Sequence, residues 1–382
     1  MRAADFLASD TGRLVPTIQQ QIAFVPAPLP PGLDRGAIAV AMGDAMLGLG
    51  ELKGACRRLQ NASILIRPLQ RQEALTSSAM EGTFTTADEL VLAEAGVERD
   101  GDDSTREVVN YIRALNQSLS MLETLPISHR VITAAHATLL SGLSAARGAQ
   151  KRPGEYKSDQ NWIGGRTIEA ARYVPPPPLE ALACMDALES YINREDRGFP
   201  TALIDLALVH YQIEAIHPFA DGNGRIGRML VSLMAVDSGL LEKPVLYMSP
   251  SLEAEKDLYI DLMFAVSARG EWSPWLIFFF RKIAETCAAT VSTIDRLISL
   301  QQTYREEAST VMRTAKALML IDSLFEQPAV TISGAAARLS VTYNAAAKIV
   351  DKLVEIGILS EFPDIYPKTY VAQGVMRAAR PD

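Results

Sequence analysis

Residues 201–228 read TALIDLALVHYQIEAIHPFADGNGRIGR, and the change of character at residue 217 decides how the chain folds around this stretch. The first sixteen residues are strongly apolar, which predicts a helix at the centre of the core. The last twelve are too polar for a core and too poor in glycine for a flexible linker. The sequence therefore predicts a central helix over 201–216 that delivers a polar turn, followed by a second helix over 225–238.

The polar turn has the composition of an anion-binding site. In Asp221-Gly222-Asn223-Gly224, glycine and asparagine tolerate the positive φ angles that aim successive backbone N–H groups at one point. The N-terminus of the next helix adds unsatisfied N–H groups and the positive end of the helix dipole. Arg225 and Arg228 lie three residues apart and so share a helix face, and guanidinium forks suit phosphate oxygens. We interpret the turn as a polyphosphate site.

Two side chains beside this site predict its chemistry. Asp221 is a hard oxygen ligand of the kind that nucleotide-bound Mg²⁺ requires. His217 is the one group here that can be an uncharged base near neutral pH. A hydroxyl that loses its proton to His217 could attack a phosphorus held over the turn. A histidine at a helix end or a glycine turn alone is usually structural, but their combination with the acid and both arginines predicts phosphoryl or nucleotidyl transfer.

The chain as a whole is predicted to be mainly α-helical and to have three parts. Residues 1–105 form a helical region, 106–300 hold the central helix and the polar turn, and 301–382 form a further unit. In the first part, the helical pattern is expected to break at Arg67-Pro68. In the second, Gly164-Gly165 between two strand-like runs predicts a β-hairpin. The third reads as helix, short helix, turn, helix and β-wing, which is a winged helix-turn-helix.

Composition excludes several classes of protein. The formal net charge of −8 argues against a protein whose main role is to coat nucleic acid, although it leaves room for a small DNA-reading module. Cys56, Cys184 and Cys287 are far apart and lack metal-ligand spacing, which is typical of a reducing compartment. The N-terminus has early acids and no apolar segment, unlike a secretory signal, and the longest apolar run (275–280) is too short to cross a bilayer. We expect a cytoplasmic protein without a membrane segment.

The polar turn resembles the signature of one family. HPFADGNGRIGR matches HPF-x-[DE]-GNGR-x-x-R, the signature of the Fic (Fic/Doc) family, at every specified position. NWIGGRTIEAARYVPPPP resembles the family's flap hairpin, and EVVNYIRAL and HYQIEAIHPF resemble its flanking helices. With VPAPLPP and the C-terminal winged helix, the resemblance to three-part bacterial members covers nearly the whole chain. It implies a Fic core over 106–300 and Mg²⁺-dependent transfer of AMP from ATP to a Ser, Thr or Tyr hydroxyl of a protein target or of the protein itself.

The resemblance also implies roles for individual residues. His217 would be the general base and Asp221 the Mg²⁺ ligand, while Phe219 would anchor the turn in the core. The nucleotide would be bound by the anion-binding loop and the two arginines: Gly222, Asn223, Gly224, Arg225 and Arg228. A flap edge can pair with an extended target segment through its backbone. The residues expected to dock the target in this way are Trp162, Ile163, Gly164, Gly165 and Arg166.

A second, shorter motif predicts an inhibitor within the chain. SSAMEG (77–82) resembles the family's inhibitory motif [ST]-x-x-x-E-[GN], in which Ser77, Glu81 and Gly82 are the specified positions. In that class the glutamate, here Glu81, pairs with the second arginine, here Arg228, and obstructs the γ-phosphate of ATP. A carboxylate and a phosphate would compete for one guanidinium fork. The alternative is that Glu81 is an ordinary surface glutamate near a helix end.

Two features leave alternatives open. Relatives commonly carry a Tyr-Tyr pair near the adenine, whereas this chain has Leu258 and Tyr259, so Tyr259 either stacks on the base or packs on the core and the preference for ATP is open. Residues 310–382 carry eight basic and seven acidic side chains, a balance that favours protein interaction or a homodimer over specific DNA binding. The alternative functions are a transcription regulator with a nucleotide-sensing core, and UMP transfer or de-AMPylation at the same site.

Overall fold

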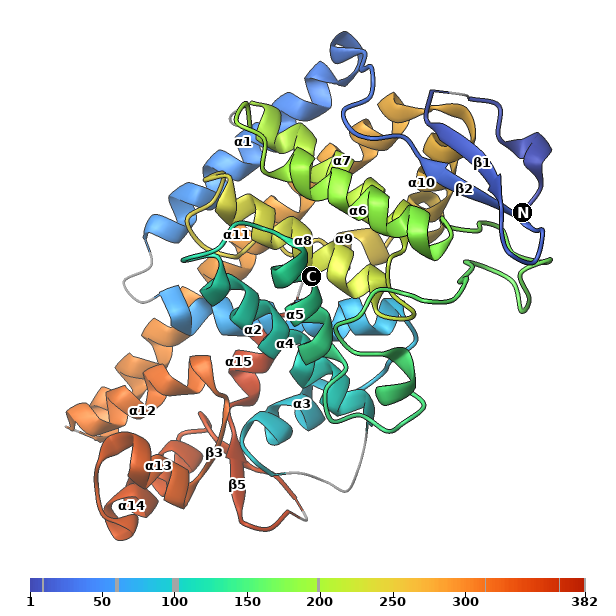
Figure 1. Cartoon of the computed structure of the whole chain (residues 1–382). Coiled ribbons are helices and arrows are strands. Elements are labelled where there is room, and N and C mark those ends of the chain that lie inside the picture. The colour runs from blue at the N-terminus through green and yellow to red at the C-terminus, as the bar shows by residue number, and fades with distance from the viewer. Residues whose placement is uncertain are drawn as a thin grey trace.

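The computed structural model describes residues 1–8, 10–58, 62–97, 103–197, 200–312, 314–363 and 365–380. Helices dominate, and the few strands lie at the two ends of the molecule (Figure 1). The predicted class, mainly α, is confirmed. The helices are η1 (Ala3–Asp5), α1 (Arg35–Arg57), α2 (Ala62–Met80), α3 (Ala87–Glu94), α4 (Asp103–Met121), α5 (His129–Leu139), η2 (Ala149–Lys151), α6 (Pro178–Ile192), α7 (Thr201–Ile216), α8 (Asn223–Asp237), α9 (Ser249–Glu253), α10 (Lys256–Arg269), α11 (Trp272–Val311), α12 (Ala315–Glu326), α13 (Ile332–Leu339), α14 (Tyr343–Glu355) and α15 (Gln373–Ala378).

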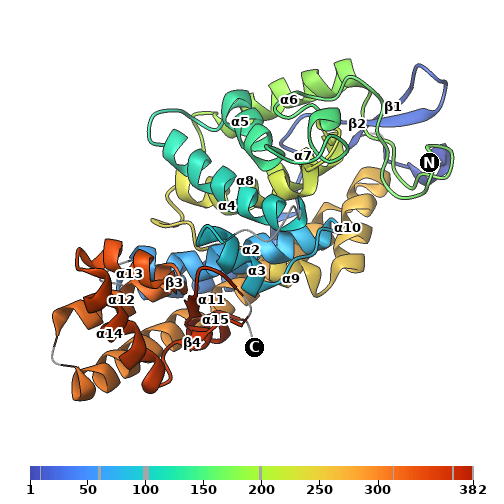
Figure 2. The same cartoon turned by 90° about the horizontal axis from the view of Figure 1, so that it is seen from below.

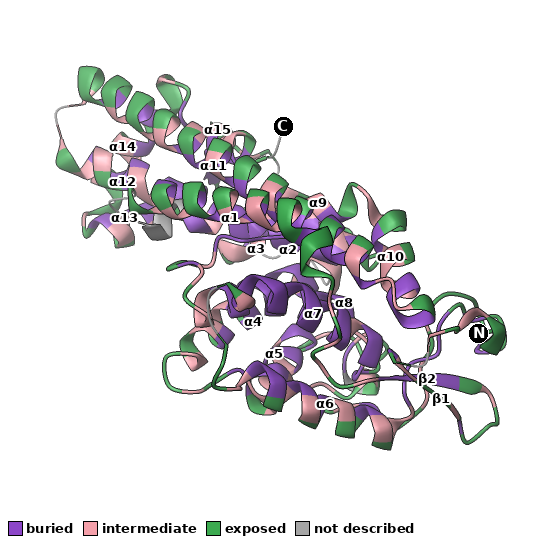
Figure 3. Ribbon diagram, turned by 90° about the horizontal axis from the view of Figure 1, so that it is seen from above, coloured by how far each residue is buried: buried purple, intermediate pink, exposed green. Residues whose placement is uncertain are grey.

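Helix α7 is the centre of the core. All of its residues except Thr201 and Glu214 are buried, as expected for a helix that is apolar on every side. It packs against α6, α8, α10 and α11 and against strand β2 (Ile22–Pro26). Figure 3 shows α7 and the adjoining α8 as the most continuously buried helices of this half of the molecule. The predicted central helix over residues 201–216 is confirmed.

The long helix α11 belongs to two parts of the molecule at once. Its first half packs along α1 and against α7, and its second half packs against α12 and α15. The boundary predicted between residues 300 and 301 therefore falls inside a continuous helix. The sequence pattern suggested a division there because the apolar face becomes narrower after Leu297, while the helix itself continues to Val311.

Helix α2 corrects a second sequence prediction. The break was expected at Arg67-Pro68, but α2 continues through Pro68. Proline removes one backbone hydrogen bond from a helix. Burial of the following turns compensates for that loss, because Leu69 and Ala74 are buried where α2 packs on α4, α9 and α12. Near the middle of α2, Arg71 forms an ion pair with Glu94 (2.5 Å) and donates a hydrogen bond to the carbonyl oxygen of Glu326 on α12.

The strands form two small sheets. Strands β1 (Gly12–Pro16) and β2 form an antiparallel hairpin in which Leu14 pairs with Phe24. The predicted hairpin around Gly164-Gly165 is less regular than expected: the chain reverses direction there, but a single antiparallel bridge joins Ile163 and Tyr173. Both glycines have positive φ, and a Cβ at Gly165 would crowd the backbone of Ala170. These close contacts explain why glycine occupies position 165.

The C-terminal unit lies at the end of the molecule opposite the β1–β2 hairpin (Figure 2). It contains α12, β3 (Ala329–Thr331), α13, α14, β4 (Ser360–Glu361) and β5 (Thr369–Val371) in chain order, and its sheet has the order β3-β5-β4. The side chains of Thr331 and Thr342 cap α13 and α14. This order of elements is the one expected for the unit, although its assignment as a winged helix stays a prediction. Among the described residues, no helix is long and apolar enough to traverse a bilayer.

Candidate active site

The junction between α7 and α8 builds the site. Helix α7 ends at His217, which has a left-handed backbone conformation with φ of 49°. For a residue that has a Cβ, this conformation costs roughly 1–2 kcal/mol. After the turn, Gly222 has φ of 78° and precedes the first residue of α8, Asn223. The two left-handed residues bring the ring of His217 and the N-terminus of α8 into the same cavity.

Asn223 and Phe219 fix the shape of this turn. The backbone N–H of Phe219 donates to Asn223 Oδ1 (2.8 Å), and Asn223 Nδ2 donates back to the carbonyl oxygen of Phe219 (2.9 Å). The ring of Phe219 is fully buried and stacks on His136, with 3.9 Å between the ring centroids. Two hydrogen bonds within the motif and the buried Phe219 ring therefore fix the backbone of the turn before any ligand binds.

His136, on α5, contacts the turn and was not anticipated from the sequence. Its Nδ1 accepts a hydrogen bond from the Gly154 N–H (3.0 Å), so Nε2 carries the proton that is donated to the carbonyl oxygen of Asp221 (3.0 Å). Burial lowers the pKa of His136 to about 4, which keeps this tautomer neutral. An isolated histidine in an amphipathic helix gives no sequence signal for such a long-range contact.

His217 has the properties of a neutral base. Burial, followed by the charge of Lys157, lowers its pKa to about 4, while Glu81 and Asp221 act in the opposite direction. Its Nδ1 is buried and has no hydrogen-bond partner within the described part of the chain. The imidazole lines the cavity. An uncharged ring that faces a cavity can accept a proton from a hydroxyl group placed there.

The segment 77–82, which the sequence predicts to be inhibitory, lies directly against the start of α8. Arg228 Nη2 donates to Glu81 Oε1 (2.8 Å) and to the carbonyl oxygen of Ser77 (2.8 Å), and Arg228 Nε donates to Ser77 Oγ (2.9 Å). Burial alone would raise the pKa of the Glu81 carboxyl, but the charge and hydrogen bond of Arg228 outweigh it and the pKa is lowered. Glu81 is therefore a carboxylate at neutral pH. Gly82 follows it with φ of 82° and ends the segment.

Gly224 shows how closely the Glu81 carboxylate approaches the predicted phosphate site. A Cβ at Gly224 would collide with Glu81 Oε1 and would also approach Arg228 Nη1 at 2.8 Å. The carboxylate thus lies over the first turn of α8, where N–H groups and the helix dipole favour an anion. A negatively charged side chain of the protein lies at the place where the sequence predicts a phosphate.

The first arginine of the motif, Arg225, is held differently. Arg225 is buried, with its Nη1 2.6 Å from Glu107 Oε2 on α4 and its Nη2 3.3 Å from Asp221 Oδ1. Glu107 also accepts from Thr83 Oγ1 (2.8 Å). Arg225 and Arg228 therefore bind different partners, although their spacing predicted that both would face one phosphate site. In this arrangement, Arg225 connects the turn to α4 and only Arg228 reaches the cavity.

Asp221 fits the role of a magnesium ligand. Its side chain is 41% exposed, and its Oδ1 accepts from the Gly222 N–H (2.6 Å). No group of three or more His, Cys, Asp or Glu side chains suited to hold a metal occurs among the described residues. A Mg²⁺ ion at Asp221 would therefore complete its shell with phosphate oxygens and water, as Mg²⁺ commonly does in nucleotide sites.

A cavity of about 410 Å³ connects the polar turn with an apolar wall. Its polar side chains include Glu81, Glu214, His217 and Arg228. Burial raises the pKa of Glu214 to about 7, and its Oε1 has no partner in the described structure. The apolar wall consists of side chains from α7, the flap and α10: Ile163, Tyr173, Tyr211, Tyr259, Ile260, Met263 and Phe264.

The remaining predicted site residues divide between the cavity and the surface. Tyr259 lines the cavity but is only 4% exposed, and its hydroxyl is hydrogen-bonded to His210 Nε2 (2.8 Å), so it belongs to the core as well as to the cavity wall. Ile163 and Gly164 line the cavity, whereas Trp162 is 42% exposed. The other two flap residues, Gly165 and Arg166, are exposed. Arg172 closes the flap onto α10 through Asp261 (2.6 Å).

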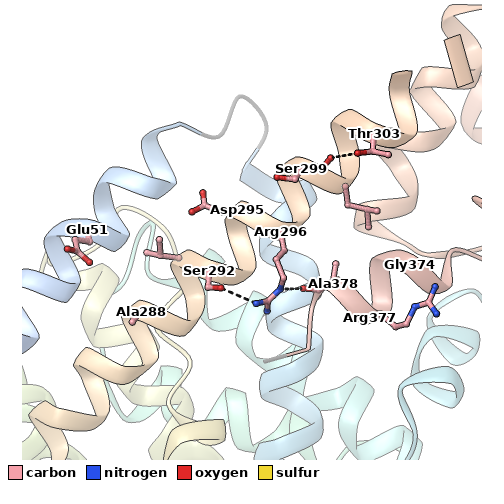
Figure 4. A pocket seen from close by; sticks show the side chains of 12 residues that line it. Glu51, Ala288, Ser292, Asp295, Arg296, Ser299, Thr303, Gly374, Arg377 and Ala378 are labelled. Atoms are coloured by element: carbon pink, nitrogen blue, oxygen red, sulfur yellow. Dashed lines mark hydrogen bonds between the residues drawn. The ribbon is translucent and has the colours of Figure 1, made fainter. Parts of the chain in front are cut away.

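A larger hollow lies elsewhere, between α1, α11 and α15 (Figure 4). Its volume is about 920 Å³, and its rim includes Glu51, Asp295 and Arg377. Arg296 within it donates to the carbonyl oxygen of Ala378 and to Ser292 Oγ. None of the motif residues lines this hollow. The larger volume therefore does not identify the candidate active site. The smaller cavity is lined by the neutral imidazole of His217 and by Gly224 at the N-terminus of α8.

Comparison with known proteins agrees with this geometry. Residues 39–120 match the Fic/DOC family N-terminal domain and residues 126–235 match the Fic/DOC family domain. The chain therefore carries Fic/DOC family domains. It is homologous to protein adenylyltransferase Fic of Drosophila melanogaster (27% identity over 200 residues, 51% of this chain and 37% of the relative) and of Drosophila virilis (28%, 51% and 38%). The chain matches little more than a third of the length of these relatives.

Solved structures show the same fold. A Fic family protein from Desulfovibrio desulfuricans G20 aligns with a TM-score of 0.55 and 18% identity, covering 90% of this chain and 98% of that one. A Fic domain-containing signalling protein from Bacteroides thetaiotaomicron aligns with a TM-score of 0.51 and 21% identity, covering 65% and 97%. At these identities, the similarity establishes the architecture of the helices around the site.

Proposed function

We propose that this protein transfers AMP from ATP to a Ser, Thr or Tyr hydroxyl of a protein, itself included, and that Glu81 restrains the reaction. The observation that carries the proposal is the position of the Glu81 carboxylate, 2.8 Å from Arg228 and against Gly224 at the start of α8. An anion of the protein lies at a helix N-terminus near a neutral imidazole whose Nδ1 has no hydrogen-bond partner among the described residues. A nucleotide phosphate is the natural alternative occupant of this position.

In the proposed reaction, the hydroxyl oxygen attacks the α-phosphorus and the bond from that phosphorus to the bridging β-oxygen breaks. The hydroxyl proton passes to His217, and pyrophosphate leaves. Arg228 and the N–H groups at the start of α8 stabilise the negative charge that accumulates on the leaving group. Mg²⁺, held by Asp221 and the nucleotide, would neutralise further phosphate charge when bound.

Inhibition follows from competition for Arg228. The guanidinium already makes three hydrogen bonds, to Glu81 and to two atoms of Ser77. A γ-phosphate that approaches this arginine must displace the carboxylate or accept a position beside it, where two negative charges repel each other. ATP can then bind only with its phosphates shifted, which moves the α-phosphorus away from the attacking hydroxyl.

One observation favours a second reaction at the same site. Glu81 is ionised, and it lies close enough to His217 for its charge to influence the pKa of the imidazole. A carboxylate in that position could activate water to remove AMP from a modified protein. De-AMPylation is therefore the second candidate, and UMP transfer is a variant of the first because Tyr259 alone does not define an adenine pocket.

We propose a separate role for the C-terminal unit. Its element order supports a winged helix, and Tyr343 at the start of α14 is 56% exposed. The near-zero charge balance of residues 310–382 favours contact with a protein or a second copy of this chain over DNA. Retention on DNA that depends on Asn344 and Lys348 would instead support the transcription-regulator alternative.

The test uses purified wild-type, Glu81→Gly and His217→Ala proteins incubated with Mg²⁺ and α-labelled ATP, with α-labelled UTP in parallel. We expect label on protein in Glu81→Gly, little in the wild type and none in His217→Ala. Label from UTP but not from ATP would change the nucleotide. Absence of label in all three folded proteins, with released AMP from a pre-labelled substrate only when Glu81 is present, would replace transfer by de-AMPylation.

A further inference from the structure

Four successive carbonyl groups at the end of α7 accept hydrogen bonds from one short segment of the chain. Lys157 Nζ donates to the oxygen of Ile216 (3.3 Å), and the Lys157 N–H donates to that of Pro218 (2.8 Å). Asn161 Nδ2 donates to the oxygens of His217 (3.0 Å) and Phe219 (3.0 Å). Two residues, four apart, thus satisfy every carbonyl from 216 to 219.

These bonds occur where the backbone most needs them. The last carbonyl groups of a helix lack partners within the helix, and His217 adopts the left-handed conformation described above. The ammonium group of Lys157 also donates to Asn161 Oδ1 (2.7 Å), which orients the amide so that its Nδ2 faces the two carbonyls. Lys157 is only 5% exposed, so water does not compete for these bonds.

We propose that Lys157 and Asn161 are positioning residues for His217, and that they connect the base to the flap. This inference rests on the proposed function. Asn161 is the first residue of the flap and directly precedes Trp162, the first residue expected to dock a target, so the flap would also determine where the imidazole lies. A misplacement of about 1 Å at a reacting group can lower a rate on the order of 100-fold.

Charge supports the same conclusion. The groups that act on His217 are Lys157, Glu81 and Asp221, together with the backbone of Glu214. Burial lowers the pKa of Lys157 to about 7, and Cys184 is the other titratable group that acts on it. While it is protonated, Lys157 opposes protonation of the nearby imidazole. It thereby favours the neutral form of the base.

The first test compares two adjacent amides in the Glu81→Gly background. Asn161→Ala removes the donors to residues 217 and 219. Gln160→Ala removes the neighbouring amide, one methylene longer, which in the described part of the chain donates to the carbonyl oxygens of Asn161 and Pro175. We expect Asn161→Ala to lower kcat for self-labelling from α-labelled ATP by at least about tenfold, with the Kd for ATP changed less than twofold. Gln160→Ala should change either value less than about twofold.

Equal losses in the two variants, or an unchanged kcat in Asn161→Ala, would overturn the proposal. A second variant protects the test against misfolding of Asn161→Ala. Lys157→Met keeps the length of the side chain and removes its charge, so the pKa of His217, followed by NMR titration of its imidazole, should rise. An unchanged pKa would exclude the electrostatic role. The titration needs no activity, so a Glu81→Gly protein that fails to label would contradict the proposed function and leave this result valid.

Discussion

Glu81 and Arg228 are 147 positions apart in sequence, yet their side chains meet at 2.8 Å. The contact joins the C-terminal end of α2 to the second turn of α8, across the mouth of the cavity that contains His217. Its chemistry is that of a ligand contact, because the carboxylate lies over a helix N-terminus. We expect nucleotide affinity, the coupling to Gly224 and part of the stability to depend on this pair.

Removing the carboxylate should strengthen nucleotide binding. In Glu81→Gly the guanidinium of Arg228 becomes available to a phosphate, so we expect the Kd for Mg²⁺-ATP to fall at least about tenfold, since a charge-assisted hydrogen bond contributes roughly 1.5–3 kcal/mol. Titration calorimetry measures the change. Glu94→Gly is the matched control, because it breaks the ion pair with Arg71 outside the cavity and should leave the Kd unchanged.

Gly224 should be coupled to Glu81. A Cβ at residue 224 would collide with Glu81 Oε1, so Gly224→Ala is expected to destabilise the wild type more than it destabilises Glu81→Gly. The coupling should be on the order of 1 kcal/mol, the range found for residues in direct contact. Urea unfolding of the four proteins of the double-mutant cycle gives the value. Additive effects would mean that the carboxylate does not lie against α8 in solution.

Arg228 should contribute to stability as well as to binding. Arg228→Met leaves the carbonyl and hydroxyl of Ser77 and the carboxylate of Glu81 without their donor. We expect the free energy of unfolding to fall by about 1–3 kcal/mol, because Glu81 is partly exposed and water replaces part of the lost interaction. Chemical denaturation measures this loss. In Glu81→Gly the same substitution should cost less.

Acid should destabilise the protein through three buried histidines. His136 and His217 have folded-state pKa values of about 4, and His210 of about 3, because burial opposes their charge. Unfolding returns each to about 6.5. Between these limits the unfolded chain binds more protons, so stability is full above about pH 6.5 and is lost as the pH falls toward 4, by up to roughly 1.4 kcal/mol per pH unit for each histidine.

Denaturation midpoints measured from pH 8 to pH 4 give this slope. His136→Asn removes one of the three histidines and should make the slope shallower in this window; Glu214, whose raised pKa of about 7 contributes with the opposite sign, is present in both proteins. A slope that is equal in the variant and the wild type would show that His136 is protonated in the folded protein. The acid limb of AMP transfer should likewise lie below the ordinary pKa of histidine, because His217 stays neutral until about pH 4.

The sequence predicted the parts of the fold that depend on local pattern. The central helix over 201–216 follows from the strongly apolar composition of these sixteen residues, and the turn after it follows from the glycines and asparagine of the motif. Pro68 was interpreted as a helix break because the local rule does not include burial of α2 on three neighbouring helices. The flap has one bridge, between Ile163 and Tyr173, where the sequence predicted two paired strands, and Gly165 packs closely against the Ala170 backbone, a contact that no local pattern specifies.

Partners of the motif were harder to anticipate than the motif itself. Glu107, His136 and Asn161 lie 56 to 118 positions away from the groups they contact. Each is an ordinary polar residue in its own segment, so only the folded chain identifies its role. A buried glutamate on the apolar side of α4 was the one available signal, since an unpaired carboxylate at such a position would be costly.

Helix α2 connects the cavity with the C-terminal unit. One of its turns is fastened to α3 and α12 through Arg71, and its last turn places Glu81 at the cavity. The nine residues between Arg71 and Glu81 extend for about 15 Å at 1.5 Å per residue, nearly all of it within the regular helix α2. The C-terminal unit, which contacts α2 through the carbonyl oxygen of Glu326, is therefore connected by a single helix to the carboxylate of Glu81 at the cavity.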